Sequence, residues 1–257
     1  MPLPSLVSVL RARGTCLTAW IATPEPLIAE NAARVGFDCV TLDMQHGLHD
    51  PASVMRGIGA VALGGVPAVV RIPVGDFAMA SRALDMGASA IIAPMINSAA
   101  DARAFAAAAK YPPIGERSWG PVRTMQLSGV SDGGAYLRSA NAEVLTFAMI
   151  ETRAAVDALD EILDVSGIDA VFIGPSDLSI ALSDGADVDP MRPDNQRVAA
   201  DILRRARQAG KLAGIFAVTA AQAKHYRALG YDLVACGTDG IYFRLGASTM
   251  LAEARAE

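Results

Sequence analysis

The sequence has few lysines, few cysteines and few aromatic residues, and each shortage argues against a class of protein. The lysines are Lys110, Lys211 and Lys224. None of them is predicted to project from a strand into a pocket, which argues against Schiff-base catalysis. The three cysteines lie far apart in apolar runs, so we expect small core residues and no metal cluster or disulfide framework. Aromatic residues make up 5% of the chain and would leave few platforms on which sugar rings could stack.

An excess of positive charge and a long apolar run are also missing. The 22 Lys and Arg residues face 27 Asp and Glu residues, for a net charge of -5, so no nucleic-acid partner is expected. The longest uncharged stretch, Met86 to Ala100, contains Pro94 and is shorter than the roughly 18 residues of a membrane-spanning helix. The first residues lack the basic region of a signal peptide. We therefore expect a cytoplasmic protein that makes no contact with membranes.

What the sequence does contain is a repeated alternation of short apolar runs and helical patterns. With 257 residues, 52% of them hydrophobic, the chain can form one large core. Eight strand-like runs, apolar on both faces, each precede a helical pattern. This pattern predicts an α/β protein, a single (β/α)8 TIM barrel over residues 1–257. One connection, at about 111–141, is rich in Gly, Pro, Ser and Arg and is predicted to be a long functional loop.

The barrel prediction locates candidate site residues, because active sites of such barrels lie on the loops after the carboxyl ends of the strands. Several polar residues follow the predicted strands. They are Asp43 and His46 after the second strand, Arg71 after the third, Glu151 after the fifth, and Ser176 and Asp177 after the sixth. We expect these side chains to converge at one rim.

Glu151 and Asp177 leave adjacent predicted strands and suit one hard divalent cation such as magnesium or manganese. Two carboxylates also serve glycoside hydrolysis, which the shortage of aromatic residues disfavours. A structural alternative is that both carboxylates pair with arginines such as Arg123 or Arg153.

The turn from Gly174 to Asp177 opens a predicted helix, whose amides at Ser176 and Asp177 would bind an anion. A 2-oxo acid held there by its carboxylate would lie beside the cation, and Arg71 would stabilise an enolate. His46 is the natural base, and Asp43 is its nearest strand-end carboxylate.

The residues at these strand ends resemble the HpcH/HpaI aldolase family. The motifs are Leu42-Asp43-Met44-Gln45-His46-Gly47, Val69-Val70-Arg71, Ala93-Pro94-Met95, Ile150-Glu151-Thr152 and Phe172-Ile173-Gly174-Pro175-Ser176-Asp177-Leu178. The resemblance extends into the long loop at Tyr111-Pro112-Pro113 and Gly115-Glu116-Arg117. It implies a class II, divalent-metal-dependent aldolase that acts on pyruvate-type donors and aldehyde acceptors. It also implies a homo-hexamer, a trimer of dimers, whose C-terminal helix is exchanged between subunits.

By this resemblance, His46 is the proton acceptor and Arg71 is the transition-state stabiliser. Asp85 would raise the basicity of the histidine, and it could come from an adjoining subunit. The position of Asp43 at the end of the same predicted strand suggests Asp43 for that role, so both Asp43 and Asp85 stay candidates. Glu151 and Asp177 match the metal ligands of the family.

Two positions depart from the family pattern. Gln45 stands where many relatives carry Glu, and Met149 stands where relatives that cleave dicarboxylic substrates have a substrate-contacting Gln. Methionine cannot donate that hydrogen bond. Trp119 and Arg123, in the long loop, are candidates for the acceptor side of the substrate site, and Arg123 suits a carboxylate.

The resulting hypothesis is reversible cleavage of a 4-hydroxy-2-oxo acid into pyruvate or hydroxypyruvate and an aldehyde. The expected cofactor is Mg, Mn or Co, without an organic cofactor. Alternatives are an acyl-CoA thioester lyase of the same superfamily, a metal-dependent isomerase or mutase that forms the same enolate, and a non-catalytic 2-oxo acid sensor.

Overall fold

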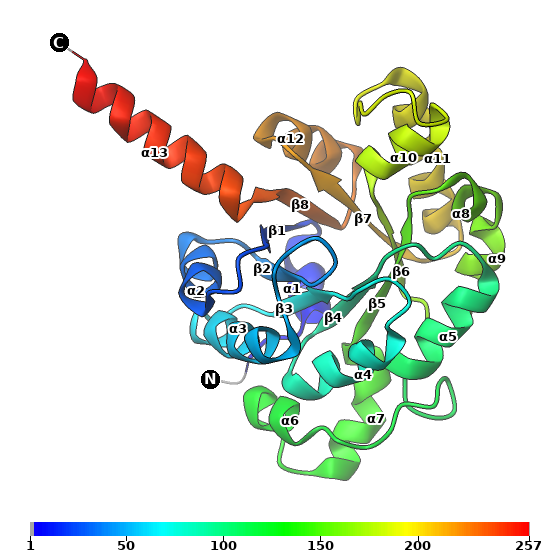
Figure 1. Cartoon of the computed structure of the whole chain (residues 1–257). Helices are drawn as coiled ribbons and strands as arrows, with labels where there is room; N and C mark the ends of the chain where they lie inside the picture. Colours follow the sequence, from blue (N-terminus) through cyan, green and yellow to red (C-terminus); the bar gives the residue numbers. More distant parts are fainter. Residues whose placement is uncertain (1–2, 257) are drawn as a thin grey trace.

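Eight parallel strands pair in chain order and close into a barrel in the computed structural model, which describes residues 3–256 (Figure 1). Strand β1 pairs with both β2 and β8, which closes the ring. The predicted (β/α)8 barrel is therefore confirmed. The strands are β1 Cys16–Ile21, β2 Cys39–Asp43, β3 Ala68–Arg71, β4 Ala90–Ala93, β5 Leu145–Ile150, β6 Ala170–Ile173, β7 Leu212–Ala217 and β8 Leu233–Thr238.

Most of the helices surround the strands on the outside of the barrel (Figure 1). The helices of the described chain are α1 Leu6–Arg13, α2 Pro26–Val35, α3 Pro51–Leu63, α4 Phe77–Met86, α5 Ala99–Ala109, α6 Val122–Ser128, α7 Gly133–Glu143, α8 Arg153–Asp157, α9 Leu159–Leu163, α10 Pro175–Leu182, α11 Pro193–Gln208, α12 Ala220–Leu229 and α13 Asp239–Arg255. Among residues 3–256, none of the helices has both the length and the apolarity needed to cross a bilayer.

The strands are apolar on both faces because each face packs against a different core. In β5, Phe147 and Met149 join the cluster inside the barrel, whereas Ala148 and Ile150 join the cluster between barrel and helices. This alternation is the two-residue period of a strand. Cys16 and Cys39 are fully buried in the inner cluster, and the cysteines of the described chain are all free, as expected for core residues.

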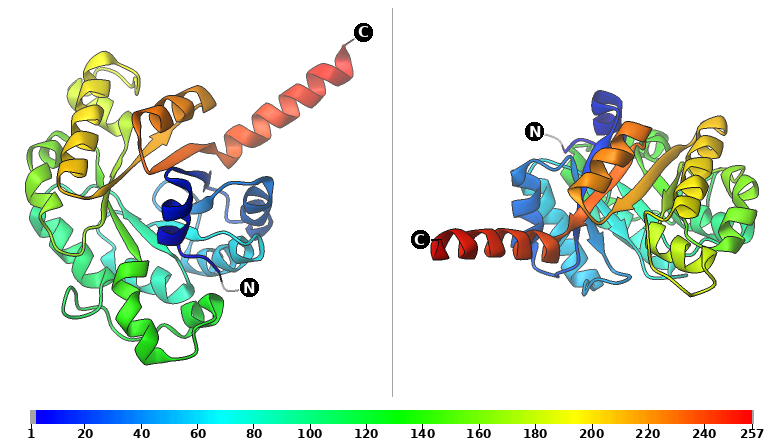
Figure 2. Two further views of the ribbon diagram at one scale, coloured as in Figure 1. Left: turned by 180° about the vertical axis from the view of Figure 1, so that it is seen from behind. Right: turned by 90° about the horizontal axis from the view of Figure 1, so that it is seen from above.

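Helix α1 covers the amino-terminal end of the barrel, and Figure 2 (left) shows it from that side. Its residues Leu6, Val7 and Leu10 are buried in the same cluster as the inner residues of the strands. The carboxyl ends of the strands, at the opposite rim, are the end that this helix does not cover. The molecule thus has one closed end for stability and one open end for chemistry.

The connection expected to be a loop at about 111–141 contains two helices, α6 and α7. The two helices were not predicted because their sequence signals are weak. Helix α6 has no side-chain cap at Pro121, and α7 begins with two glycines, which are poor helix formers. Packing compensates for these weak local signals. Trp119 lies against both Tyr111 and Tyr136, with ring centroids 5.7 and 6.1 Å away.

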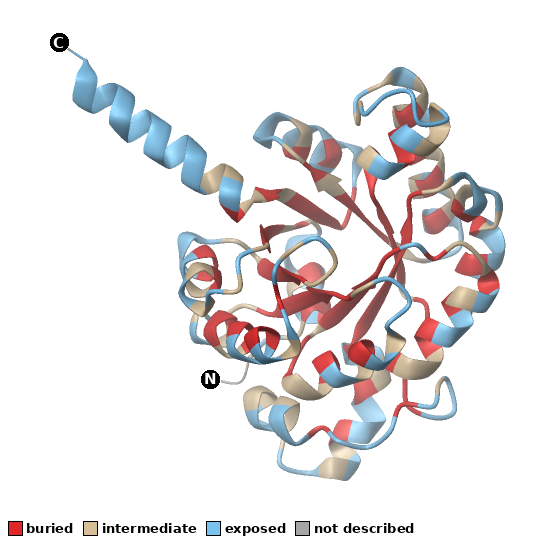
Figure 3. Cartoon of the chain, viewed as in Figure 1, coloured by how far each residue is buried: buried red, intermediate tan, exposed pale blue. Residues whose placement is uncertain are grey.

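Helix α13 extends away from the barrel instead of lying on it (Figures 1 and 2). Its side chains are exposed along nearly its whole length, as the pale blue ribbon shows (Figure 3). They include Phe243, 77% exposed, and Met250, 73% exposed. Large apolar side chains at this exposure are typical of a surface that binds another protein.

Lys110 is 1% exposed and binds three acceptors near the amino ends of β5 and β6. Its Nζ atom lies 2.7 Å from Asp169 Oδ2 and donates to the carbonyls of Asn141 and Val144. Burial lowers the pKa of Lys110, and the charge of Asp169 opposes that shift. This lysine therefore ties α5, α7 and β6 together at the end remote from the predicted site.

We predict that Lys110→Met lowers the free energy of unfolding by about 3 kcal/mol, because it breaks a buried ion pair and strands its acceptors. Urea denaturation measures the change. The matched control is Lys224→Met on the exposed side of α12, which should change the stability by less than about 0.5 kcal/mol. Equal effects of the two substitutions would contradict a structural role for Lys110.

Candidate active site

A pocket of about 320 Å³ opens at the carboxyl ends of the strands. Residues predicted from the sequence line it together with apolar side chains from β1, β6 and β7. The lining residues are Trp20, Ala22, Asp43, His46, Arg71, Met149, Phe172, Gly174, Pro175, Ser176, Asp177, Phe216 and Thr238. Of the residues that the sequence singled out at strand ends, Asp43, His46, Arg71, Ser176 and Asp177 line this pocket, whereas Glu151 is buried against Gly174 and is not among the lining residues.

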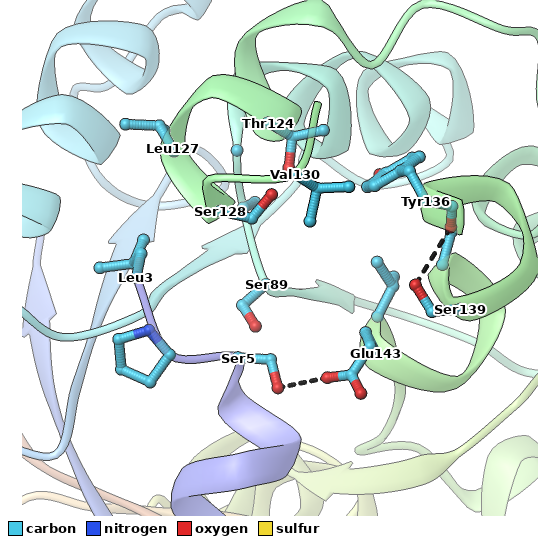
Figure 4. A pocket seen from close by; sticks show the side chains of 15 residues that line it. Leu3, Ser5, Ser89, Thr124, Leu127, Ser128, Val130, Tyr136, Ser139 and Glu143 are labelled. Atoms are coloured by element: carbon cyan, nitrogen blue, oxygen red, sulfur yellow. Dashed lines mark hydrogen bonds between the residues drawn. The ribbon is translucent and has the colours of Figure 1, made fainter. Parts of the chain in front are cut away.

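A second pocket, of about 310 Å³, lies between the N-terminal segment, α6 and α7 (Figure 4). Its lining is mainly serine, threonine and apolar side chains, and Glu143 is the charged residue among those that line it. In Figure 4 the Glu143 carboxylate accepts a hydrogen bond from Ser5. This pocket lacks the several converging ionisable groups of the rim pocket, so the rim pocket is the candidate active site.

Asp43 and Arg71 end two neighbouring strands in register, β2 and β3, and form a two-pronged ion pair. Arg71 Nε donates to Asp43 Oδ1 at 2.8 Å, and Nη2 donates to Oδ2 at 2.6 Å. Trp20 Nε1 donates to the same carboxylate at 3.1 Å, and the guanidinium lies over the Trp20 ring. Such a fork fixes the orientation of an arginine. Arg71 is thereby held rigidly at the edge of the pocket.

Opposing effects act on the pKa of Asp43. Burial raises it, but the hydrogen bonds and charge of Arg71, with the hydrogen bond from Trp20, outweigh burial and hold the pKa below its usual value. The carboxylate thus stays ionised. It also accepts the backbone amides of Gln45 and His46, at 3.0 and 3.4 Å, so the same group shapes the turn that carries the histidine.

Glu151 is 1% exposed, and only one of its two carboxylate oxygens has a hydrogen-bond partner. Its Oε1 accepts the amide of Met95 at 2.8 Å, while its buried Oε2 has no hydrogen-bond partner among the described residues. Burial raises the pKa of Glu151 to about 7, and the charge of Asp177 adds to this effect; the Met95 amide and Arg71 oppose it. A buried oxygen without a partner, beside a second carboxylate, calls for a positive ligand.

Gly174 leaves the space in front of that oxygen open. A Cβ atom at this position would lie 2.5 Å from Glu151 Oε2, so any other residue would displace the carboxylate. Gly174 caps α10, whose first turn carries Ser176 and Asp177. Neither Glu151 nor Asp177 forms an ion pair with a described arginine, and Arg153 pairs with Asp184 instead.

These features fit a divalent cation held by few protein ligands. Within residues 3–256, no group of three or more His, Cys, Asp or Glu side chains is arranged to hold a metal ion. Glu151 and Asp177 would therefore be two oxygen ligands of an ion that completes its shell with water and substrate, as Mg²⁺ commonly does. The donor set is all oxygen, which suits a hard cation.

His46 lines the pocket from the loop after β2 and is exposed. No carboxylate of the described residues hydrogen-bonds its imidazole ring. The contact between Asp43 and His46 is with the backbone amide of the histidine. The carboxylate oxygens of Asp43 accept hydrogen bonds from Arg71 and Trp20. The structure thus differs from the expectation that Asp43 orients the ring, because the in-register neighbour Arg71 is the stronger partner.

Comparison with known proteins agrees with this geometry. The sequence profile of the family described as HpcH/HpaI aldolase/citrate lyase matches residues 17–245, which is nearly the whole barrel. The chain belongs to the HpcH/HpaI aldolase/citrate lyase family. A solved member from Burkholderia cenocepacia superimposes with a TM-score of 0.84 at 30% identity, over 96% of this chain and 97% of that one.

Curated relatives of this family member carry aldolase names. The hydroxypyruvate/pyruvate aldolase of Rhizorhabdus wittichii is 40% identical over 93% of this chain and 94% of its own. The 2-keto-3-deoxy-L-rhamnonate aldolase of Klebsiella pneumoniae is 36% identical over 89% and 85%. The predicted family and the predicted activity, a class II aldolase and hence a lyase, are confirmed at this level.

Besides the buried Glu151, three predicted residues lie outside the rim pocket of this chain. Asp85, at the end of α4, pairs with Arg117 at 2.6 Å. Trp119 packs in the aromatic cluster of the α5–α7 segment. Arg123 lines a different groove between α2, α3 and α6. None of them meets the pocket within one chain, because the segment that carries Trp119 and Arg123 packs on the outside of the barrel.

Sequence reasoning missed several residues of the site. Trp20, Phe172 and Phe216 form an aromatic wall, with Trp20 centroids 5.6 and 5.2 Å from the other two rings. Each of these aromatic residues lies in an apolar strand, and the sequence of such a strand does not distinguish a side chain that fills the core from one that lines the pocket. Met95 has a positive φ of 55° and its amide binds Glu151. A left-handed backbone at a bulky residue has no sequence signal.

We predict that Asp43→Asn lowers the free energy of unfolding by about 3 kcal/mol near neutral pH, because it leaves the buried Arg71 charge without its partner. The pKa of Asp43 is lowered in the folded state, so the stabilisation is present above the unfolded pKa of about 4. It is lost as the pH falls through the lower folded pKa. Urea denaturation of wild type and variant should therefore give curves that converge in acid.

The matched control is Asp201→Asn, which breaks the exposed Arg204–Asp201 pair on α11. It should change the stability by less than about 1 kcal/mol. A difference between wild type and Asp43→Asn that is small, or that does not change with pH, would contradict the role given to the ion pair.

Proposed function

We propose that this family member reversibly cleaves 4-hydroxy-2-oxo acids into a pyruvate-type 2-oxo acid and an aldehyde, with a divalent cation at Glu151 and Asp177. The observation that carries the proposal is the buried Glu151 Oε2 without a partner. It lies against Gly174, directly before the first turn of α10, whose residues Ser176 and Asp177 line the rim pocket together with Arg71. A cation site, an anion site and a fixed positive charge then share one pocket.

The donor carboxylate would bind the backbone amides of Ser176 and Asp177. These residues occupy the first turn of α10, where amides have no partner within the helix and the helix dipole favours an anion. Gly174, which has no side chain, precedes this turn. The donor would lie between this turn and Arg71.

Glu151 and Asp177 would hold the cation, for which Mg, Mn and Co are the candidates. A bound cation would act as a Lewis acid toward the 2-oxo group of the donor. The positive charge would also return Glu151 to its ionised form at neutral pH, since an opposite charge lowers the pKa of a carboxyl group. The absence of an organic cofactor stays a prediction from the sequence.

In the cleavage direction, a base takes the proton of the 4-hydroxyl group, the C3–C4 bond breaks, and the bond electrons move into an enolate. The aldehyde is formed at C4. We assign the proton to His46, which lines the pocket. Arg71 stabilises the negative charge of the enolate, since its guanidinium is already oriented by Asp43. Return of a proton to C3 gives the 2-oxo acid.

The pocket wall favours pyruvate or hydroxypyruvate with an aldehyde that carries little charge. Trp20, Phe172, Phe216 and Met149 are apolar or weakly polar, and Met149 cannot donate a hydrogen bond to a second carboxylate. The aldolase name shared by several relatives, hydroxypyruvate/pyruvate, supports this choice of donor.

We further propose a homo-oligomer, a hexamer as a trimer of dimers, in which α13 docks on a neighbouring subunit. The support is an exposed apolar surface on α13 and an open apolar groove of about 630 Å³ where α13 leaves the barrel beside α2. In such an assembly Asp85 of the partner subunit would reach His46, and the outward-facing Trp119 and Arg123 would approach a neighbour's pocket. A cytoplasmic location stays a prediction.

Removal of divalent ions by a chelator should abolish cleavage, and Mg²⁺, Mn²⁺ or Co²⁺ should restore it. Calorimetry with Mn²⁺ should give a dissociation constant that Glu151→Gln and Asp177→Asn each weaken more than about tenfold. The control is Glu161→Gln on the exposed surface of α9, which should bind as wild type does. Full activity of the chelator-treated protein would refute the cation mechanism.

His46→Asn should lower kcat for cleavage by about 10² to 10⁴, the usual contribution of a positioned base, with little change in KM. Steady-state kinetics with saturating cation measures both constants. His225→Asn on the exposed face of α12 is the control and should keep the wild-type kcat. A His46→Asn enzyme with normal kcat would assign the proton to another group.

A further inference from the structure

Asp239, which follows β8 and begins α13, is buried and binds backbone amides of the segment after β1. Its Oδ1 accepts the amide of Ala22 at 3.2 Å, and its Oδ2 accepts the amide of Thr23 at 2.9 Å. These two residues form the turn after β1. The carboxylate is 217 positions from Ala22 in sequence, so this contact joins the last strand of the barrel to the first.

Ala22 in turn holds the loop that carries His46. Its carbonyl accepts the amide of Leu48 at 2.8 Å, and Ala22 itself lines the rim pocket. Gly47 packs tightly against the backbone of Asp43 and Ala22, so that no room is left for a side chain. A Cβ at Gly47 would lie 2.2 Å from the Asp43 carbonyl oxygen and 3.0 Å from the Ala22 carbonyl oxygen. A shift of Ala22 is therefore passed on to the loop.

The charges around His49 show how close Asp239 lies to the same loop. His49 is 8% exposed, and its Nδ1 lies 3.2 Å from Ser53 Oγ. Burial, the larger effect, lowers the pKa of His49, while the charges of Asp43, Asp239 and Asp50 oppose it. Three carboxylates, from Asp43, Asp239 and Asp50, thus lie near the loop that carries His46 and His49. Of these, Asp239 is the one that is distant from the loop in sequence.

We propose that Asp239 is a positioning residue: through the Ala22 and Thr23 amides and the Ala22–Leu48 bond, it fixes the His46 loop in the geometry that proton transfer requires. It touches neither the donor subsite at α10 nor Arg71. Its effect should therefore appear in kcat and leave the KM for the 2-oxo acid nearly unchanged. The kinetic part of this inference rests on the proposed function, whereas the structural part does not.

The chain offers a closely matched control at the other end of the same strand. Asp232 precedes β8, is 7% exposed like Asp239, and accepts the Ala213 amide at 2.7 Å and Arg207 at 2.8 Å. It lies at the amino-terminal rim, remote from the pocket. Asp232→Asn therefore removes an equally buried carboxylate without touching the His46 loop.

The test compares Asp239→Asn and Asp232→Asn in the full-length protein with saturating Mn²⁺. Asp239→Asn should lower kcat roughly 10- to 100-fold, the cost of a misplaced catalytic group. Asp232→Asn should keep the wild-type kcat even where its thermal stability falls. Hydrogen exchange followed by mass spectrometry should show faster exchange of the Ala22, Thr23 and Leu48 amides in Asp239→Asn alone. Light scattering should show the same assembly for all three proteins.

Equal kcat losses in the two variants, unchanged exchange at the three amides, or a loss of kcat that follows dissociation of the assembly would overturn the proposal. The exchange measurement separates this inference from the proposed function. A wild-type protein that fails to cleave any 4-hydroxy-2-oxo acid would refute the function, while the exchange result would still decide whether Asp239 holds the loop.

Discussion

Two carboxylates that share one pocket repel each other unless a positive charge lies between or beside them. Glu151 and Asp177 lie close enough for the charge of Asp177 to raise the pKa of Glu151. Burial deprives Glu151 of water, and Gly174 keeps the space in front of its free oxygen open. Folding alone leaves this oxygen without a partner among the described residues, and that is the observation behind the proposed cation site. The other features of the pocket, including the α10 amides and Arg71, gain their chemical meaning from that requirement.

The barrel separates the work of stability from the work of chemistry. At the closed rim, Lys110 and Asp232 satisfy backbone groups of neighbouring elements and have no access to the pocket. At the open rim, Asp43 and Asp239 also bind backbone amides, but there the amides belong to the loops that carry the site. A buried carboxylate that accepts peptide N–H groups thus occurs at both rims, at Asp232 on the closed one and at Asp43 and Asp239 on the open one.

The sequence predicted the barrel because the strands are apolar on both faces, and it predicted part of the pocket because polar residues follow several strand ends. Asp43, Arg71 and Asp177 were found by that rule alone. The partner of Asp43 could not be predicted, since the β2–β3 register that brings Arg71 to it exists only in the folded chain. Helices α6 and α7 were missed because their local signals are weak. Asp239 was missed because its partners lie at the opposite end of the sequence.

Exchange of the methyl protons of pyruvate in heavy water measures enolate formation directly, without an aldehyde and without knowledge of the natural substrate. With a divalent cation present, the wild-type protein should catalyse incorporation of deuterium into pyruvate. After removal of the cation, the rate should fall to that of the solution reaction. Exchange that proceeds equally well without a cation, or that does not occur with one, would contradict the claim that Glu151 and Asp177 hold a metal ion that drives the chemistry.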